Sequence, residues 1–335
     1  MSHQVTVLGA GSWGTALAIH LGRIGHDVRL WARASQLVAS MAERGVNDAY
    51  LSEVPLPASV RPTASLEEAL VGSTCVVAAV PSHGARAVIR DARAWIPAGT
   101  PIVSAAKGLE PDTMRRMSQV IEEETSGENP VAVLSGPSFA LELARELPTA
   151  VLVASSDPPV IELVQEEFRS KCFRLYASDD VIGVELGGAL KNVIAIAAGV
   201  VESLGLGHNA QAGLITRGLA EITRVVHAAG GQRETLAGLS GLGDLVLTCT
   251  GALSRNRRVG IELGKGRPLA EILAGMRMVA EGVRTTGAAL ALGTAHGVEL
   301  PIAGQMAEVM AGRVAPRVAV ETLMLRRQRV EAEVR

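Results

Sequence analysis

A glycine-rich loop between a short apolar run and a helical run is the feature that most constrains this fold. Residues 9–14 read Gly-Ala-Gly-Ser-Trp-Gly, directly after the strand-like run 5–8 and directly before the helical run 15–19. In that context the first glycine makes a tight turn, the second lets the backbone approach a pyrophosphate, and the third lets the helix pack closely on the strand. The N-terminus of the helix then faces the phosphates. The pattern predicts a dinucleotide site formed by Gly9, Gly11, Ser12, Trp13 and Gly14. A turn without a ligand and a methyltransferase loop stay open as alternatives.

Six further strand-like runs follow, with helix-length segments such as 14–24, 84–95 and 111–126 between strands. The runs span 28–31, 75–80, 101–104, 131–134, 150–153 and 173–176. Near-continuous apolar strands that alternate with helices are typical of a parallel sheet covered on both faces. The first half is therefore expected to be an α/β domain with a doubly wound, Rossmann-type parallel sheet.

The strand signals stop near residue 179, and helical periodicity continues to about residue 328. Ser178-Asp179-Asp180 has the composition of a helix start. We therefore expect a Rossmann-type dinucleotide-binding domain over 1–183 and an all-α substrate-binding and catalytic domain over 184–335. The boundary is a change of structural class and not a flexible linker.

Composition disfavours several classes of protein. A formal net charge of −2 leaves no polybasic face for nucleic acid. The three cysteines form no CxxC pair and the histidines lack metal-ligand spacing, so neither a disulfide framework nor a metal site is expected. The apolar run 193–201 is far shorter than a membrane span, and residues 4–8 already form a strand where a signal peptide would lie. A cytoplasmic protein without stable membrane insertion is expected.

Lysine is rare in this chain: only four of the 32 basic residues are lysine. Lys107 and Lys191 stand among small and apolar residues, whereas Lys171 and Lys265 lie in polar stretches. Unlike arginine, a partly desolvated lysine gives up its proton near neutral pH. The scarcity agrees with lysines kept for proton transfer, and equally with a general arginine bias.

Four unusual tripeptides fall at the ends of predicted strands. They are Gly9-Ala10-Gly11, Val80-Pro81-Ser82, Ala106-Lys107-Gly108 and Ser135-Gly136-Pro137. Ligands of a doubly wound sheet gather at the carboxyl ends of its strands. Lys107 is therefore expected to face the cofactor crevice.

The residue after the second strand indicates which dinucleotide binds. An NAD-specific site usually has an acidic residue there, but this chain has Arg33, and Asp27 lies at the wrong end of the strand. Arg33 is suited to pair with a 2′-phosphate, which favours NADP, with NAD as an alternative. A solvated arginine is the other explanation of Arg33.

Six motifs, in order and across both predicted domains, resemble the bacterial, NAD(P)-linked glycerol-3-phosphate dehydrogenases. They occupy 9–16, 104–110, 135–140, 185–193, 241–245 and 254–257. The resemblance implies interconversion of dihydroxyacetone phosphate and sn-glycerol 3-phosphate for phospholipid synthesis, in a homodimer. One departure is the stretch 47–52, which matches the family's Asn-x-x-Tyr-Leu-Pro pattern only loosely.

The resemblance assigns catalytic roles to three residues. Lys191 carries over as the proton donor and acceptor for the substrate oxygen. Lys107, expected in the same crevice, would lower the proton affinity of Lys191 by like-charge repulsion, or stabilise the oxyanion. Asp244, in a tight glycine turn, would orient Lys191 or a substrate hydroxyl; a helix N-cap is the alternative for Asp244.

The resemblance also implies contacts with the substrate and the cofactor. Arg255 offers a planar fork for phosphate, and Ser254 and Asn256 add neutral hydrogen bonds. Without the other motifs, 254–258 would look like a solvated, basic helix start. The remaining contacts implied are Gly136, Ser138, Lys107, Lys191 and Asp244 for the substrate, and Lys107, Ala140, Arg255, Val279 and Glu281 for the cofactor.

Two other functions stay open. A 3-hydroxyacid dehydrogenase of similar build would need a clamp for a carboxylate, whereas 254–256 suit phosphate. A non-catalytic NADP(H) sensor would keep the glycine loop without needing Lys107, Lys191 and Asp244 together.

Overall fold

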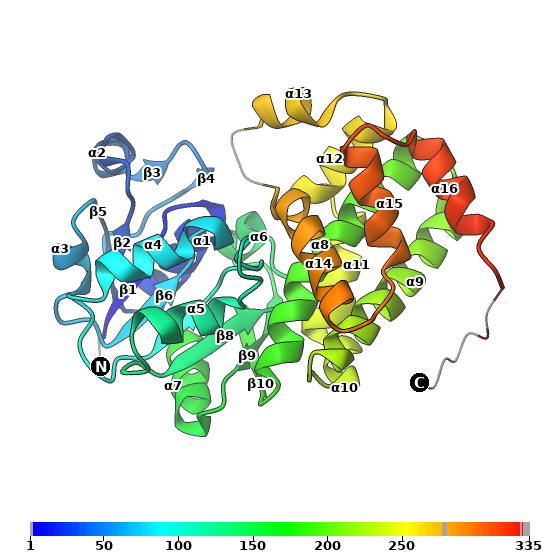
Figure 1. Cartoon of the computed structure of the whole chain (residues 1–335). Helices are drawn as coiled ribbons and strands as arrows, with labels where there is room; N and C mark the ends of the chain where they lie inside the picture. Colours follow the sequence, from blue (N-terminus) through cyan, green and yellow to red (C-terminus); the bar gives the residue numbers. More distant parts are fainter. Residues whose placement is uncertain (1–2, 277–279, 329, 331–335) are drawn as a thin grey trace.

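The computed structural model has two halves that lie side by side, a sheet half and a helical half (Figure 1). It describes residues 3–276, 280–328 and 330. The change from strands to helices falls after β10, and the helical half begins with α8 at Val181. The domain boundary predicted after residue 183 stays a prediction.

An eight-stranded sheet forms the core of the first half, in the order β10-β9-β8-β7-β6-β1-β2-β5. Its strands are β1 (Gln4–Leu8), β2 (Asp27–Trp31), β5 (Val60–Thr63), β6 (Cys75–Ala78), β7 (Ile102–Ser104), β8 (Val131–Ser135), β9 (Thr149–Ala154) and β10 (Phe173–Ser178). If β1, β2, β5, β6, β7 and β8 are numbered 1 to 6 along the chain, their order in the sheet is 3-2-1-4-5-6, as in a dinucleotide-binding sheet. The point where the order reverses lies between β1 and β6, beside the glycine loop.

The sheet is mostly parallel, as the sequence predicted, and it contains one antiparallel pair. β8 and β9 pair antiparallel, with Leu134 opposite Val153, while β9 and β10 run parallel to each other. Only the short helix α6 (Ala140–Ala144) separates β8 from β9. A parallel connection has to return along the full length of the sheet and usually needs a longer crossover.

Helices and one hairpin complete the sheet half. They are α1 (Ser12–Arg23), α2 (Ser35–Arg44), the β3–β4 hairpin (Val46–Asn47 and Leu51–Pro55), α3 (Leu66–Leu70), α4 (Ser82–Ala92), α5 (Met117–Glu124), α6 and α7 (Pro158–Phe168). α5 is shorter than the helix expected over 111–126, because Leu109 and Arg116 form a β-bridge and Arg116 is the N-cap residue, whose backbone N–H donates to Gln119 Oε1. The sequence also missed β5, in which Pro62 is tolerated because the strand lies at the edge.

The helical half packs around α8. Its elements are α8 (Val181–Ser203), α9 (Gly207–Ala228), α10 (Arg233–Leu236), the π-helical turn η1 (Leu239–Gly243), α11 (Asp244–Thr250), α12 (Arg255–Gly264), α13 (Leu269–Ala274), α14 (Glu281–Ala295), α15 (Pro301–Met310) and α16 (Pro316–Met324). Asp180 caps α8 by accepting a hydrogen bond from the Gly183 backbone N–H, as the composition of 178–180 predicted. A Cβ at Gly260 would lie 1.9 Å from the Ile196 carbonyl oxygen, so α12 crosses α8 in close backbone contact.

α8 is the one described helix long and apolar enough to cross a membrane, with a mean hydropathy of 1.6. The apolar stretch is thus longer than the run 193–201 suggested. In the structure 89% of it is buried inside the protein, where it carries Glu185 and Lys191. α8 is the core helix of the second half, and other helices surround it (Figure 1).

Candidate active site

The glycine loop is built by backbone at the end of β1. Gly9 has a φ of +113°, and its N–H donates to the Trp31 carbonyl. A Cβ at Gly14 would lie 2.0 Å from the Gly9 carbonyl oxygen, whereas a Cβ at Gly11 would meet nothing within 4 Å. No side chain caps α1. The loop therefore leaves open space in front of an uncapped helix N-terminus, which fits a dinucleotide pyrophosphate.

The segment after α2 supports this loop, a role that the sequence did not reveal. Asn47 is fully buried, and its amide donates to the Ala10 carbonyl (2.9 Å) and to Thr15 Oγ1 (2.8 Å). Ser12 Oγ donates to the Tyr50 carbonyl (2.9 Å). Trp13 Nε1 is buried with no hydrogen-bond partner among the described residues. The stretch that departs from the family pattern thus holds the glycine loop in place.

The end of β2 presents a cation and no carboxylate. Arg33 follows β2 with an exposed side chain. Asp27 lies at the start of the strand and accepts a hydrogen bond from Arg29 (2.7 Å). These positions fit a dinucleotide that carries a 2′-phosphate.

Two lysines from different halves converge on one carboxylate. Lys107 follows β7, and its Nζ donates to Asp244 Oδ2 (2.8 Å). Lys191, on α8, donates from Nζ to Asp244 Oδ1 (2.5 Å). The side chains of Lys191 and Asp244 are only 6% and 1% exposed, while Lys107 is 18% exposed. Each carboxylate oxygen therefore holds one ammonium group.

Burial lowers the pKa of Lys191 from its ordinary value of 10.5 to about 8. Asp244 opposes this shift, and repulsion from Lys107 lowers the pKa further. The repulsion acts in the direction expected from the sequence, but desolvation is the larger cause. Lys191 thus gains or loses its proton close to neutral pH, as a general acid–base residue requires.

Asp244 is the first residue of α11 and follows the π-helical turn η1. The N-cap residue of α11 is Gly243, so the alternative of Asp244 as a helix N-cap is wrong. Thr248, one turn along α11, accepts from Lys191 Nζ (2.6 Å) and donates to the Asp244 carbonyl (2.6 Å). Thr248 was not predicted as a site residue, although its i+4 spacing from Asp244 is visible in the sequence.

Lys107 is also held by the turn after β8. Its Nζ donates to the Gly136 carbonyl (2.7 Å) and to Ser138 Oγ (3.2 Å). A Cβ at Gly188 would lie 2.5 Å from Ser135 Oγ and 3.8 Å from Lys107 Cγ, so the glycine lets α8 approach the lysine stem. Gly136 and Ser138 therefore belong to the same cluster as the two lysines.

The 254–256 segment begins α12, and its three side chains differ in how they are engaged. Ser254 caps the helix by accepting from the Arg257 N–H (3.2 Å). Asn256 donates to Asn192 Oδ1 (2.9 Å) and accepts from the Gly282 N–H (3.0 Å). Arg255 is exposed and makes no hydrogen bond or ion pair among the described residues. The guanidinium is thus available to an anion, while Asn256 ties α8, α12 and α14 together.

Glu281 reaches across to the sheet half. Its carboxylate accepts from Ser82 Oγ (2.9 Å) and from the Ser82 N–H (3.3 Å) at the start of α4. A Cβ at Gly108 would lie 3.3 Å from the same carboxylate, so Glu281 is close to the Lys107 loop. Ala140 begins α6, beside the turn that contacts Lys107. Val279 lies outside the described residues.

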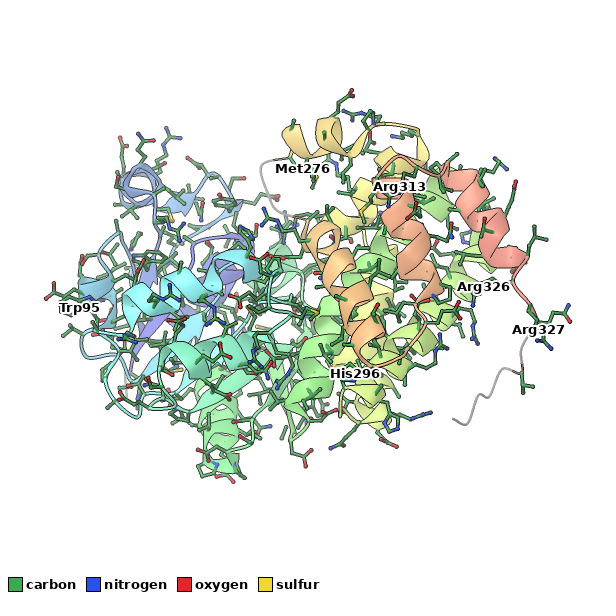
Figure 2. The ribbon with its side chains drawn as sticks, viewed as in Figure 1. Trp95, Met276, His296, Arg313, Arg326 and Arg327 are labelled. Carbon is green, nitrogen blue, oxygen red and sulfur yellow. The ribbon has the colours of Figure 1, made fainter. Side chains whose placement is uncertain are left out.

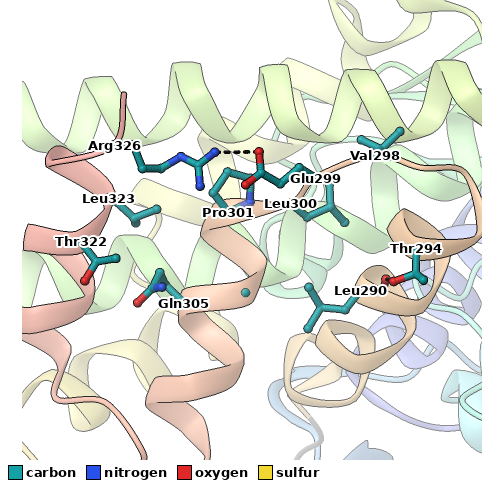
Figure 3. A pocket seen from close by; sticks show the side chains of 11 residues that line it. Leu290, Thr294, Val298, Glu299, Leu300, Pro301, Gln305, Thr322, Leu323 and Arg326 are labelled. Carbon is teal, nitrogen blue, oxygen red and sulfur yellow. Dashed lines mark hydrogen bonds and ion pairs between the residues drawn. The ribbon is translucent and has the colours of Figure 1, made fainter. Parts of the chain in front are cut away.

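Other features of the described chain lie away from this cluster. Among the described residues, no group of three or more His, Cys, Asp or Glu side chains could hold a metal ion. A cavity of about 370 Å³ lies between α14, α15 and α16, where Arg326 pairs with Glu299 at its edge (Figure 3). It contains none of the predicted site residues. The labelled Arg326 and Arg327 lie at the end of the helical half remote from the sheet (Figure 2).

A dinucleotide loop beside two lysines that share one carboxylate, one of them with a lowered pKa, fits the arrangement of a two-domain, nicotinamide-dependent dehydrogenase. Family models agree: NAD-dependent glycerol-3-phosphate dehydrogenase N-terminus matches residues 4–160, and the C-terminus model matches 180–321. The chain belongs to the family of NAD-dependent glycerol-3-phosphate dehydrogenases.

Individual relatives give the same result. The chain is 54% identical over 265 residues to glycerol-3-phosphate dehydrogenase [NAD(P)+] of Thioalkalivibrio sulfidiphilus, covering 79% of this chain and 80% of that protein. It is 52% identical to the Moorella thermoacetica protein of the same name over 272 residues, or 81% of each chain. The crystal structure of glycerol-3-phosphate dehydrogenase from Coxiella burnetii superposes with a TM-score of 0.94, at 43% identity, over 97% of this chain and 99% of that one.

Proposed function

We propose that this chain interconverts dihydroxyacetone phosphate and sn-glycerol 3-phosphate with NADPH or NADH, and so supplies glycerol phosphate for phospholipid synthesis. The observation that carries the proposal is the convergence of Lys107 and Lys191 on the two oxygens of Asp244. This arrangement pairs one lysine of lowered pKa with a second cation beside the dinucleotide crevice. The relatives named for this reaction support the same conclusion.

When bound, the nicotinamide cofactor supplies the hydride for ketone reduction, or accepts it in the reverse direction. The glycine loop would hold its pyrophosphate and Arg33 the 2′-phosphate, with Glu281 and Ala140 as further contacts. Val279 stays in this set as an implication of the family resemblance.

Lys191 would donate its proton to the oxygen of the reduced carbonyl, and would take the proton back during alcohol oxidation. A pKa of about 8 suits both directions. Asp244 keeps the ammonium oriented and Thr248 fixes it from a second side. The hydroxyl hydrogen of Thr248 donates to the Asp244 carbonyl, so its oxygen is left to accept from Lys191.

Lys107 would place a second ammonium group beside the developing alkoxide. It stabilises negative charge on the substrate oxygen without transferring a proton. Its contacts with Gly136 and Ser138 support the substrate-binding role proposed for those two residues. Arg255 would bind the substrate phosphate, with Ser254 and Asn256 ordering the helix start that carries it.

One assay compares this proposal with its rivals. Purified protein is given NADPH and either dihydroxyacetone phosphate or a panel of keto acids, and the series is repeated with NADH. We expect rapid oxidation with dihydroxyacetone phosphate alone. A preference for keto acids would favour the hydroxyacid dehydrogenase, and cofactor binding without turnover of any substrate would favour the sensor.

The chain is also proposed to act in the cytoplasm as a homodimer. The support for the dimer is the family resemblance. Light scattering after size-exclusion chromatography measures the oligomeric state directly, and a mass close to 34.8 kDa would contradict the dimer.

A further inference from the structure

The loop that carries Lys107 is attached to the helical half by an apolar contact. The loop runs from the end of β7 to the start of α5. Leu109, two residues after Lys107, is 2% exposed and belongs to the hydrophobic core around α8 with Leu186 and Leu190. A segment of the sheet half therefore has its apolar anchor in the other half.

A buried carboxylate provides a second, polar attachment of the same loop. Glu185 on α8 accepts from Arg116 Nη1 and from Ser118 Oγ, each at 2.6 Å, and from the Ser118 N–H at 2.8 Å. Its side chain is 3% exposed. Both oxygens accept hydrogen bonds, so a guanidinium and a helix N-terminus hold the carboxylate.

The two attachments lie close to the lysines. Arg116 pairs with Leu109 in a β-bridge, which brings the polar attachment next to the apolar one. Glu185 lies six residues before Lys191, or about 9 Å along α8 at 1.5 Å per residue. The same helix thus bears one lysine of the pair and holds the loop that bears the other.

We propose that Glu185 is a positioning residue that fixes the Lys107 loop on α8, so that both lysines stay on the two oxygens of Asp244. The inference rests on the proposed function of the lysine pair. A hydrogen bond joins Lys107 directly to Asp244. The lysine stands on a loop between two elements, so the position of its side chain depends on how firmly the backbone of that loop is held. Glu185 holds this loop in place from α8, the helix that also carries Lys191.

Loss of the carboxylate has a specific consequence for Lys191. The groups that act on its pKa are Asp244, Lys107 and Cys249, besides burial. If the loop becomes mobile, Lys107 moves away from Lys191 and no longer repels its positive charge. The Asp244 carboxylate then interacts with Lys191 alone. Both changes stabilise the charged form of Lys191, so its pKa rises.

The test compares Glu185→Gln with the natural protein in dihydroxyacetone phosphate reduction across pH. We expect kcat to fall about tenfold to hundredfold, as for a displaced catalytic group. The pH at which activity is lost on the alkaline side should move upward. The Kd for NADPH, measured by fluorescence titration, should change much less than kcat, since the glycine loop is untouched and Lys107 is only one of the cofactor contacts.

Glu221→Gln is the matched control. Glu221 is also buried in the helical half, 3% exposed, and caps α15 by accepting from the Ile302 and Ala303 N–H groups. Burial raises the pKa of both glutamates. We expect Glu221→Gln to lower the melting temperature while leaving kcat and the alkaline limb in place.

Arg116→Lys and Arg116→Met examine the partner cation. Arg116→Lys keeps the positive charge and should retain most of the natural turnover. Arg116→Met removes the charge and should reproduce the effects of Glu185→Gln. If Glu185→Gln does not fold, Ser118→Ala removes one of its hydrogen bonds and should shift the alkaline limb in the same direction by less.

Normal kcat with an unmoved alkaline limb in folded Glu185→Gln, or in folded Ser118→Ala if that replaces it, would overturn the proposal. Equal loss of kcat in Glu221→Gln would overturn it too, since any buried glutamate would then do the same. Failure of the proposed function would give a different result: Lys191→Ala would retain turnover, independently of the outcome for Glu185→Gln.

Discussion

The nucleotide edge and the lysine cluster lie next to each other but are built in different ways. The glycine loop is one continuous segment whose shape comes from backbone and from missing Cβ atoms. The cluster joins side chains from three distant segments, the β7 loop, α8 and α11. A local pattern determines the first, and packing of two halves determines the second.

This difference separates two kinds of failure. Changes at the nucleotide edge should act by steric exclusion and appear in cofactor affinity. Changes in the cluster should act on protonation and charge and appear in turnover. Substitutions that mix the two readouts would weaken the distinction.

The largest effect is expected for Lys191→Ala. Removal of the proton donor should lower kcat by about 10²- to 10⁴-fold, with NADPH affinity retained. Steady-state kinetics and fluorescence titration measure the two quantities. Lys265→Ala, at an exposed lysine paired with Glu262, is the control and should match the natural protein. Near-normal turnover of Lys191→Ala would remove Lys191 from its role.

Gly11→Ala is the corresponding change on the nucleotide side. The new Cβ meets no protein atom within 4 Å, and Gly11 has a φ of −73°, so folding should be unaffected. The methyl group occupies the space left for the pyrophosphate, so dinucleotide affinity should fall by about tenfold to hundredfold. Gly213→Ala, at an equally open position on α9, is the control. Unchanged affinity in calorimetry would move the cofactor away from this loop.

Arg255→Ala should chiefly raise the KM for dihydroxyacetone phosphate. Loss of a hydrogen-bonded charge costs about 1.5–3 kcal/mol, which corresponds to roughly tenfold to a hundredfold in KM. Arg258→Ala, at an exposed arginine one turn later, serves as the control. An unchanged KM in the Arg255 variant would argue against the phosphate assignment.

Arg33→Ser should have the smallest effect, confined to the choice of cofactor. Without the guanidinium, the ratio of kcat/KM for NADPH over NADH should fall by about tenfold, because only NADPH carries the 2′-phosphate. Arg61→Ser, an exposed arginine on the edge strand β5, should leave the ratio unchanged. An equal loss with both cofactors would contradict a contact with the 2′-phosphate.

Much of the fold was predictable because local patterns determine it. The glycine loop, seven of the eight strands of the sheet and the start of the helical half all follow from short apolar runs, turn residues and caps. The antiparallel β8–β9 pair was not predictable, since an apolar strand has the same pattern in either direction. The edge strand β5 was missed because it is short and contains Pro62.

The candidate site was predictable only as a set of motifs. Lys107 could be placed at a strand end, but neither its contact with Asp244 nor the roles of Thr248, Asn47 and Glu185 has a local signature. The bonds from Lys107 to Asp244, from Lys191 to Thr248, from Asn47 to the glycine loop and α1, and from Arg116 to Glu185 join residues 32 or more positions apart. Burial of Lys191, the main cause of its lowered pKa, likewise exists only after the helices pack.

The pH dependence of kcat/KM for dihydroxyacetone phosphate reduction tests the central claim most directly. Lys191 donates a proton only while it is protonated, so activity should fall as pH rises through about 8, and glycerol phosphate oxidation should rise over the same interval. An alkaline limb that appears only near the ordinary lysine value of 10.5, or no limb at all, would contradict a buried Lys191 as the proton donor.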